Sequence, residues 1–135
     1  MPRSMDRSLG DGGMPLLAQL GVSFERYGEG WVEATWTPTA SAANPAGIVQ
    51  GGVYAVVHDA AMNFAANAGL ERGDRVSTLD LHYQILQGAS ADDVLAVRGE
   101  VARLTRSVGY LASTILDADG EPVSRATATF LVRRA

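Results

Sequence analysis

The segment from Val53 to Ala68 constrains the fold most strongly, because its apolar residues fall on almost every face of a helix. It contains no proline and no glycine, and Gly69 follows it. A helix that is apolar all round is buried inside the protein. The longer, nearly apolar stretch from Gly51 to Leu70 is about long enough to cross a bilayer, but the histidine, aspartate and two asparagines within it favour a buried helix of a soluble protein. We therefore expect the rest of the chain to surround one long central helix.

Six runs rich in β-branched and aromatic residues flank the predicted helix, two before it and four after it. The runs are Val22 to Tyr27, Gly30 to Thr37, Val76 to Leu86, Val94 to Leu104, Gly109 to Asp117 and Val123 to Val132. In the last run polar and apolar side chains alternate, which is typical of a sheet with one face in water. Turn sequences at 28–30 and 117–120 predict hairpins. We predict an α+β hotdog fold, a curved antiparallel sheet of about six strands wrapped around one long central helix.

A chain of 135 residues is expected to form one domain. Residues 1–13 are polar and glycine-rich, so we interpret them as a loose leader and place the domain at residues 14–135. The leader lacks the apolar run of a signal peptide. The chain contains no cysteine, which excludes disulfides, thiol catalysis and cysteine-ligated metals. Both observations lead us to expect a cytoplasmic protein.

Charge and motif content exclude several kinds of partner. The formal net charge is −4, and the 11 basic residues are arginines without the basic stripe of a nucleic-acid-binding face. His58 and His82 are too few and too far apart for a metal motif, so we interpret both as ordinary interior or edge histidines. Walker A, nucleophile-elbow and dinucleotide-binding motifs are missing. We expect no nucleic-acid or membrane partner, no metal and no cofactor.

Asp59 is the most informative single residue of the predicted helix. Between Gln50 and Leu70, His58 and Asp59 are the only residues that ionise at or below neutral pH. A carboxylate that is partly desolvated in a cleft is a candidate general base. The alternative interpretations are a solvated helix face or a buried ion pair between Asp59 and an arginine.

Gln50, Gly51 and Gly52 lie where the preceding loop becomes the helix. The first backbone N–H groups of a helix lack intrahelical partners and carry the positive end of its dipole. Glycines there allow a ligand close to the backbone, so this terminus is a candidate for polarising a carbonyl group. The alternative interpretation is that the two glycines only allow tight packing where the helix starts.

The segment from Asn44 to Asp59, N-P-A-G-I-V-Q-G-G-V-Y-A-V-V-H-D, resembles the signature of hotdog-fold acyl-CoA thioesterases of the PaaI-like, phenylacetate-degradation group. Asn44, Gly47, Gly51, Gly52 and Asp59 match positions of that signature. The later run S-T-L-D-L-H-Y-Q-I-L is similar to the strand in which the family often has Ser or Thr at the position of Thr78. Gln50 departs from the pattern, because many members have histidine there.

The resemblance implies a role for each matching residue. The N–H of Gly51, or else of Gly52, polarises the thioester carbonyl with support from Asn44. Asp59 acts as general base on water or as nucleophile, and Thr78 positions the water. Gln50 cannot titrate near neutral pH, so only an orienting role remains for it.

The resemblance also implies an acyl- or aryl-coenzyme A substrate and a site shared across a homodimer, with a homotetramer as the expected final assembly. Asp59 and Thr78 of one subunit are expected to face Gly51 and Asn44 of the other. The residues expected to contact substrate are Gly47, Gly52, Tyr54, Phe64, Arg103 and Arg106, with Met62 and Leu86 as further candidates for an acyl tunnel. The two arginines are candidates for the nucleotide phosphates.

Two other functions fit the same fold. An enoyl-thioester hydratase or dehydratase needs an acid and a base that reach neighbouring substrate carbons. His58 and Asp59 are adjacent on the helix and therefore point about 100° apart, which disfavours that reaction. A non-catalytic acyl-thioester-binding module is the third possibility, and turnover of acyl-CoA substrates separates it from the first.

Overall fold

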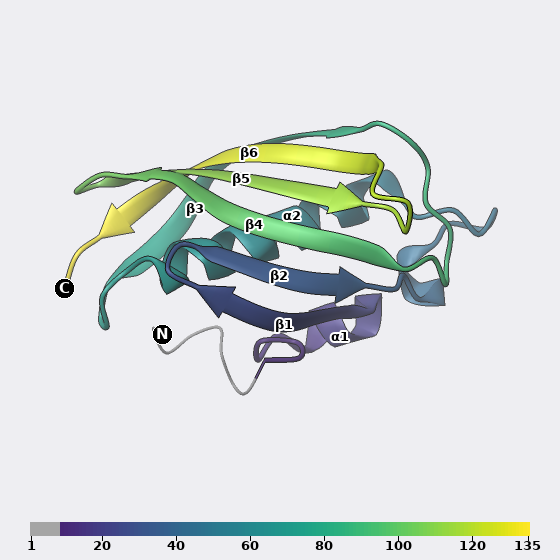
Figure 1. The fold of residues 1–135 in the computed structure, drawn as a ribbon, viewed down its shortest axis with the longest axis horizontal. Coiled ribbons are helices and arrows are strands. Elements are labelled where there is room, and N and C mark those ends of the chain that lie inside the picture. Colours follow the sequence, from purple (N-terminus) through teal and green to yellow (C-terminus); the bar gives the residue numbers. More distant parts are fainter. Residues whose placement is uncertain (1–8) are drawn as a thin grey trace.

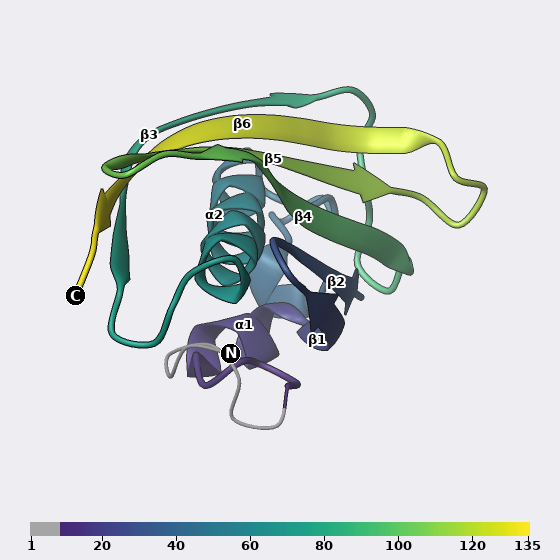
Figure 2. The same cartoon turned by 60° about the vertical axis from the view of Figure 1, so that its left-hand side comes forward.

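The computed structural model describes residues 9–135, which form one antiparallel sheet with a single long helix packed against it (Figure 1). The elements in order are α1 (Pro15–Leu20), β1 (Val22–Gly28), β2 (Trp31–Trp36), a 3₁₀ turn (Ala40–Ala42), α2 (Gly51–Ala68), β3 (Arg75–Ile85), β4 (Leu95–Leu104), β5 (Val108–Leu116) and β6 (Pro122–Arg133). The strand order in the sheet is β1-β2-β4-β5-β6-β3. The sheet curves around α2 (Figure 2), which confirms the predicted hotdog fold.

The core lies between the concave face of the sheet and α2. Ala126, Ala128 and Phe130 of β6 are buried there, whereas the neighbouring Arg125 and Thr127 are exposed, as the alternating pattern predicts. On β4 the sheet approaches the helix very closely. A Cβ atom at Gly99 would lie 2.5 Å from the carbonyl oxygen of Ala61, so no larger residue fits at this position without moving α2.

α2 begins at Gly51 rather than at Val53, and it is not buried all round. Val56, Asp59 and Asn63 follow one another along a face that is only half-buried. These three residues line a pocket together with Met14, which precedes α1, and with Thr78 and Leu81 of β3. The prediction of a fully buried helix was therefore wrong for one face, and that face carries Asp59.

The predicted leader lies only partly within the structure, because residues 1–8 fall outside the described residues. Gly10 pairs with Phe24 of β1 through two backbone hydrogen bonds of 2.6 and 3.0 Å, so residues 9–13 are attached to the sheet rather than loose. The short helix α1, which was not predicted from the sequence, follows. Pro15 starts it and Gly21, at φ 94°, ends it in the left-handed conformation. Among the described residues, neither helix combines the length and the apolar character that a membrane span requires.

β3 forms one edge of the sheet and pairs with β6 alone among the described strands. A bulge between Thr78 and Asp80 displaces Leu79, whose side chain is 59% exposed. The other edge, β1, is covered in part by the bridge to Gly10. An eleven-residue strand with open backbone groups and an exposed leucine is a surface suited to pairing with another strand.

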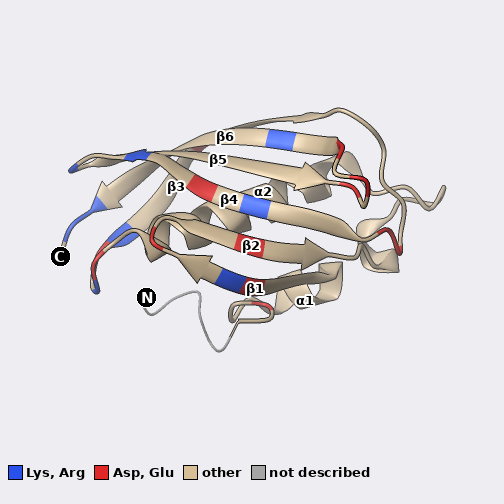
Figure 3. Ribbon diagram, viewed as in Figure 1, with Lys and Arg blue, Asp and Glu red and all other residues tan. Residues whose placement is uncertain are grey.

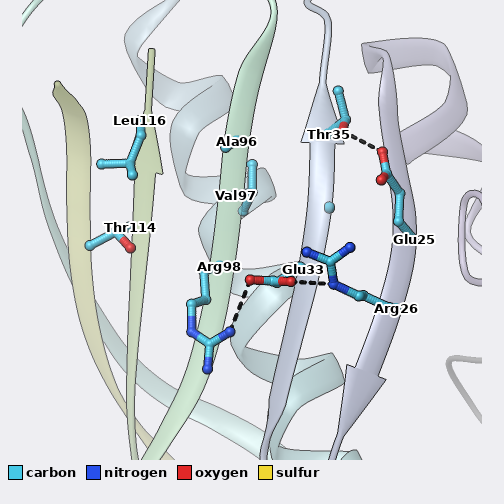
Figure 4. Close-up of a pocket in the computed structure, with 10 residues that line it drawn as sticks. Glu25, Arg26, Glu33, Thr35, Ala96, Val97, Arg98, Thr114 and Leu116 are labelled. Carbon is cyan, nitrogen blue, oxygen red and sulfur yellow. Dashed lines mark hydrogen bonds and ion pairs between the residues drawn. The ribbon is translucent and has the colours of Figure 1, made fainter. Parts of the chain in front are cut away.

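Charged residues lie on the neighbouring strands β1, β2 and β4 (Figure 3). Glu33 on β2 forms ion pairs with Arg26 on β1 at 2.5 Å and with Arg98 on β4 at 3.0 Å. The hydrogen bond from Arg26 is the main cause of the lowered pKa of Glu33. These residues line a shallow pocket, with α2 behind the sheet (Figure 4). Because the carboxylate of Glu33 is already paired with Arg26 and Arg98 on the neighbouring strands, this pocket is a poor candidate for the functional site.

Candidate active site

Two of the predicted site residues meet beside the open face of α2. The hydroxyl of Thr78 on β3 donates a hydrogen bond to Oδ1 of Asp59 on α2 at 2.6 Å. Both residues line a pocket with a volume of about 450 Å³. The other lining residues are Met14, Ala55, Val56, Ala60, Asn63 and Leu81. The pocket is therefore mostly apolar, with the carboxylate and the hydroxyl side by side in its wall.

Asp59 forms no ion pair with any residue from 9 to 135. Within this part of the chain, the ion-pair interpretation is therefore wrong. The hydroxyl of Thr78 is the donor in its contact with Asp59. The hydroxyl oxygen of Thr78 keeps its lone pairs for another donor. Together the two side chains present acceptor atoms to whatever enters the pocket.

The N-terminus of α2 is uncapped by any side chain, because Gln50 occupies the cap position without a capping hydrogen bond. Gln50 itself is exposed. The N–H of Val53 bonds to the carbonyl of Gln50 at 3.0 Å, whereas the N–H groups of Gly51 and Gly52 precede the helical ladder. This end of the helix thus offers two backbone donors.

Tyr83 holds this helix end against β3. Its hydroxyl donates to the carbonyl oxygen of Gly51 at 3.0 Å. Tyr83 was not among the residues predicted from the sequence, although it lies in the run from Ser77 to Leu86 that resembles the strand of the family. The contact fixes the peptide group that joins Gly51 to Gly52.

Asn44 shapes the loop before α2. Its Oδ1 accepts hydrogen bonds from the N–H groups of Ala46 and Ile48 at 3.0 and 3.3 Å. Gly47 in the same loop has a φ of 79°, which only glycine adopts without strain. The structure therefore gives both residues a role in the loop that delivers Gln50 and Gly51 to the helix start.

Gly51 and Asp59 do not meet within one protomer. They are eight positions apart on the same helix, which corresponds to roughly 12 Å along its axis. A single thioester carbonyl cannot be within hydrogen-bond distance of the first and next to the second. Within this chain the residues of the predicted site therefore lie in two separate places.

Several residues expected to contact substrate lie elsewhere. Tyr54 and Phe64 are buried in the core, packed against Trp36 and Phe24 with ring centroids 5.4 and 4.7 Å apart. Met62 is also fully buried. These side chains project from the face of α2 that the sheet covers, so they do not line the pocket beside Asp59, and their contact with substrate stays a prediction. Leu86 is 46% exposed.

Arg103 and Arg106 are exposed at the end of β4 and in the turn after it. Leu104 between them lies close to Gly69, which ends α2. Gly51 and these arginines are thus at opposite ends of an 18-residue helix, about 27 Å apart along its axis. Neither arginine belongs to an ion pair with residues 9–135. Contact with a nucleotide stays a prediction for both.

His58 is buried, as predicted, and its hydrogen bonds define its tautomer. Nδ1 lies 2.9 Å from the hydroxyl of Ser113, and Nε2 lies 2.7 Å from that of Ser124. Ser124 donates its hydrogen to the carbonyl of Gln84, so it must accept from Nε2–H, and Ser113 donates to Nδ1. Burial lowers the pKa of His58 to about 4. His82 is exposed on β3, and no group of three potential metal ligands occurs in the described chain.

Comparison with known proteins identifies the family of this chain. The family model described as the thioesterase superfamily matches residues 46–124. A curated protein of Haemophilus influenzae whose name describes it as an esterase is 29% identical over 80 residues. The alignment covers 59% of this chain and 58% of that relative, so the chain spans little more than half of the relative's length.

Solved structures share the fold over most of the chain. A thioesterase from Haemophilus influenzae has a TM-score of 0.81 at 23% identity, covering 88% of this chain and 82% of that one. A hypothetical thioesterase from Streptococcus pneumoniae, solved with coenzyme A, has a TM-score of 0.77 at 25% identity, with coverages of 83% and 85%. A thioesterase family protein from Silicibacter pomeroyi has a TM-score of 0.81 at 25% identity, with coverages of 90% and 91%.

Proposed function

Because the chain belongs to the thioesterase superfamily, we propose that it hydrolyses the thioester bond of an acyl- or aryl-coenzyme A. The hydrogen bond between Asp59 and Thr78 in the wall of an apolar pocket carries this proposal. A thioester substrate needs an apolar site for its acyl group and a base for water beside the carbonyl carbon. The pocket offers both.

In the proposed reaction a water molecule donates one hydrogen to Asp59 and the other to the free lone pair of Thr78. Asp59 accepts the proton as the water oxygen attacks the thioester carbon. The carbonyl oxygen becomes negative and is stabilised by the N–H of Gly51, or else of Gly52, at the positive end of α2. When the C–S bond breaks, the proton on Asp59 passes to the departing sulfur, giving a carboxylic acid and free coenzyme A.

The reacting groups come together only if a second subunit contributes one half of the site. We assign Asp59 and Thr78 to one subunit and Gly51, with Asn44 and Gln50 in its supporting loop, to the partner. The separation of Gly51 and Asp59 along α2 supports this arrangement, as does the open edge of β3. The assembly is thus a homodimer, and two dimers forming a tetramer is a further expectation.

The contacts of β3 also suggest how two subunits pair. Tyr83 contacts the helix start and Thr78 contacts Asp59, both from β3. Antiparallel pairing of two β3 strands brings these halves together when Tyr83 lies opposite the partner's Thr78. The two-fold axis then passes between Asp80 and Leu81.

Relatives add support for the substrate. The Streptococcus pneumoniae thioesterase has been solved with coenzyme A, and also as variants in which a threonine or an aspartate is replaced by alanine. In the present chain Thr78 and Asp59 are the threonine and aspartate joined by a hydrogen bond in the candidate site.

A thiol-release assay with wild-type protein and Asp59→Asn tests the proposal on acyl- and aryl-CoA substrates of different sizes. We expect free thiol from the wild type and turnover lower by roughly 10² to 10⁴ in the variant, because the amide cannot accept the proton. Thermal unfolding should change little, since the amide keeps the size of the carboxylate. A folded variant that hydrolyses its best substrate at the wild-type rate contradicts the mechanism.

Two other outcomes identify the alternative functions. Binding of acyl-CoA without release of thiol by the wild type indicates a binding module. Hydration of an enoyl-CoA without thiol release indicates a hydratase.

A further inference from the structure

Asn63 lies one helical turn after Asp59, on the same open face of α2, and lines the same pocket. No role was predicted for it from the sequence. Asn67 follows one turn later and is 5% exposed. Asp59, Asn63 and Asn67 therefore form a polar stripe on a helix whose other residues are mostly apolar.

The orientation of the Asn63 amide follows from its contacts with Asn67. Nδ2 of Asn67 lies 2.9 Å from the backbone carbonyl oxygen of Asn63, which can only accept. The same nitrogen lies 2.8 Å from the side-chain oxygen of Asn63. Because a donor faces that side of the amide, Oδ1 of Asn63 must be there. The NH₂ group of Asn63 therefore takes the other side, and it has no hydrogen-bond partner among residues 9–135.

This NH₂ group matters when an acyl chain fills the pocket. In the empty pocket water can accept its hydrogen bonds. The remaining wall is formed by Met14, Ala55, Val56, Ala60 and Leu81, none of which has a side-chain acceptor. An all-hydrocarbon acyl group that displaces the water leaves a buried donor unpaired, which costs free energy of binding.

We propose that Asn63 is a specificity-determining residue that selects acyl groups carrying an uncharged oxygen acceptor a few bonds beyond the thioester carbon. This inference rests on the proposed function. Residues four apart on a helix are about 6 Å apart along the axis, so the acceptor is expected at about this distance from the carbon that the Asp59-bound water attacks. A charged acyl carboxylate is disfavoured because it would lie close to the Asp59 carboxylate.

The test compares hexanoyl-CoA with a series of oxohexanoyl-CoA thioesters. Each member carries one ketone oxygen, and the members differ in which acyl carbon bears it. We expect wild-type kcat/KM to favour at least one ketone isomer about tenfold, which is the range for one hydrogen bond that would otherwise be unmade. Asn63→Leu and Asn63→Ala should abolish this preference, so that the ratio of kcat/KM for the ketone isomer to that for hexanoyl-CoA falls to about one. Asn67→Ala removes the donor that orients the side-chain amide of Asn63, so it should weaken the preference.

Val56→Ala is the matched control, because it changes the volume of the same pocket without removing a donor. It should leave the preference for the ketone isomer unchanged. Thermal unfolding of every variant separates loss of fold from loss of selectivity, and Asn63→Ala is the milder replacement if the leucine destabilises the helix.

Each outcome distinguishes this inference from the proposed function. Thiol release without any preference among the thioesters, or an equal loss on all of them in Asn63→Ala, overturns the role of Asn63 and leaves the hydrolase proposal standing. Absence of thiol release from every thioester overturns the hydrolase proposal and this inference with it.

Discussion

The hydroxyl of Tyr83 lies 3.0 Å from the carbonyl oxygen of Gly51, so the edge strand β3 is joined to the first peptide group of α2. If the start of α2 stabilises a negative oxygen in the transition state, its exact placement should affect turnover more than substrate binding. Tyr83→Phe keeps the ring and removes only this hydrogen bond.

For Tyr83→Phe we therefore expect kcat to fall by about three- to tenfold, the equivalent of one hydrogen bond, with KM little changed. Steady-state kinetics with thiol detection measures both constants. A rise in KM at constant kcat would show that Tyr83 serves substrate binding, contrary to this expectation.

Mixing two inactive variants tests the shared site. In a dimer of one Asp59→Asn subunit and one Asn44→Ala subunit, one composite site has all of its wild-type residues and the other has both substitutions. Random exchange of subunits should restore roughly a quarter of wild-type activity. Each variant alone should stay far below this value.

The control for subunit mixing is the same protocol with either variant mixed with itself. Mixed dimers shown by mass spectrometry that remain as inactive as the parents would place the whole site within one subunit.

Gln50 is exposed at the cap position of α2 without a capping hydrogen bond. If it orients the site, Gln50→Ala should lower turnover without changing the unfolding temperature, and Gln50→His should retain substantial activity. A kinetically silent Gln50→Ala would mean that this position of the family pattern has no role in the activity of this chain.

The buried histidine predicts how stability depends on pH. The unfolded chain protonates His58 near the ordinary histidine pKa of 6.5, whereas burial lowers this pKa to about 4 in the folded protein. Between these values the unfolded state binds a proton that the folded state does not. The free energy of unfolding should therefore fall as the pH is lowered from 6.5 to 4, by up to about 3 kcal/mol.

Denaturant unfolding at a series of pH values measures this dependence. The carboxyls of Asp74 and Asp117 have lowered pKa values, so the stability that they contribute is lost only at more acidic pH. The change in the free energy of unfolding at the upper end of the pH range is therefore expected to come from His58. His58→Gln should flatten the curve between about pH 5 and 6.5. An unchanged curve in that variant would assign the dependence to other groups.

The sequence predicted the strands well because the alternation of side chains along them has a direct physical cause. Asp59 was a candidate because a carboxylate on an otherwise apolar helix is costly unless it is exposed or hydrogen-bonded, whereas Thr78 was expected only from the family resemblance. The structure joins the two by a hydrogen bond, and their catalytic roles stay predictions. α1 was missed although Pro15 and Gly21 carry the usual start and stop signals. The segment is only six residues long, too short for a recognisable apolar period.

Assignments that depended on helix faces could not be made from residue type. Tyr54 and Phe64 are large and apolar, which suits a substrate tunnel and a core equally well. Only the curvature of the sheet decides that they face inward. Asn63 could have been found from its spacing, because a polar residue four positions after Asp59 must share its face.

The close contact between β4 and α2 has a consequence for the pocket on the opposite side of the helix. Gly99 lets the sheet approach Ala61 so closely that any side chain at position 99 would collide with the helix backbone. α2 can yield only away from the sheet, toward the open face that carries Asp59. The width of this pocket is therefore limited by a residue that does not line it, and exchange of Gly99 in a related sequence is expected to narrow the pocket and, under the proposed function, the range of acyl groups that fit.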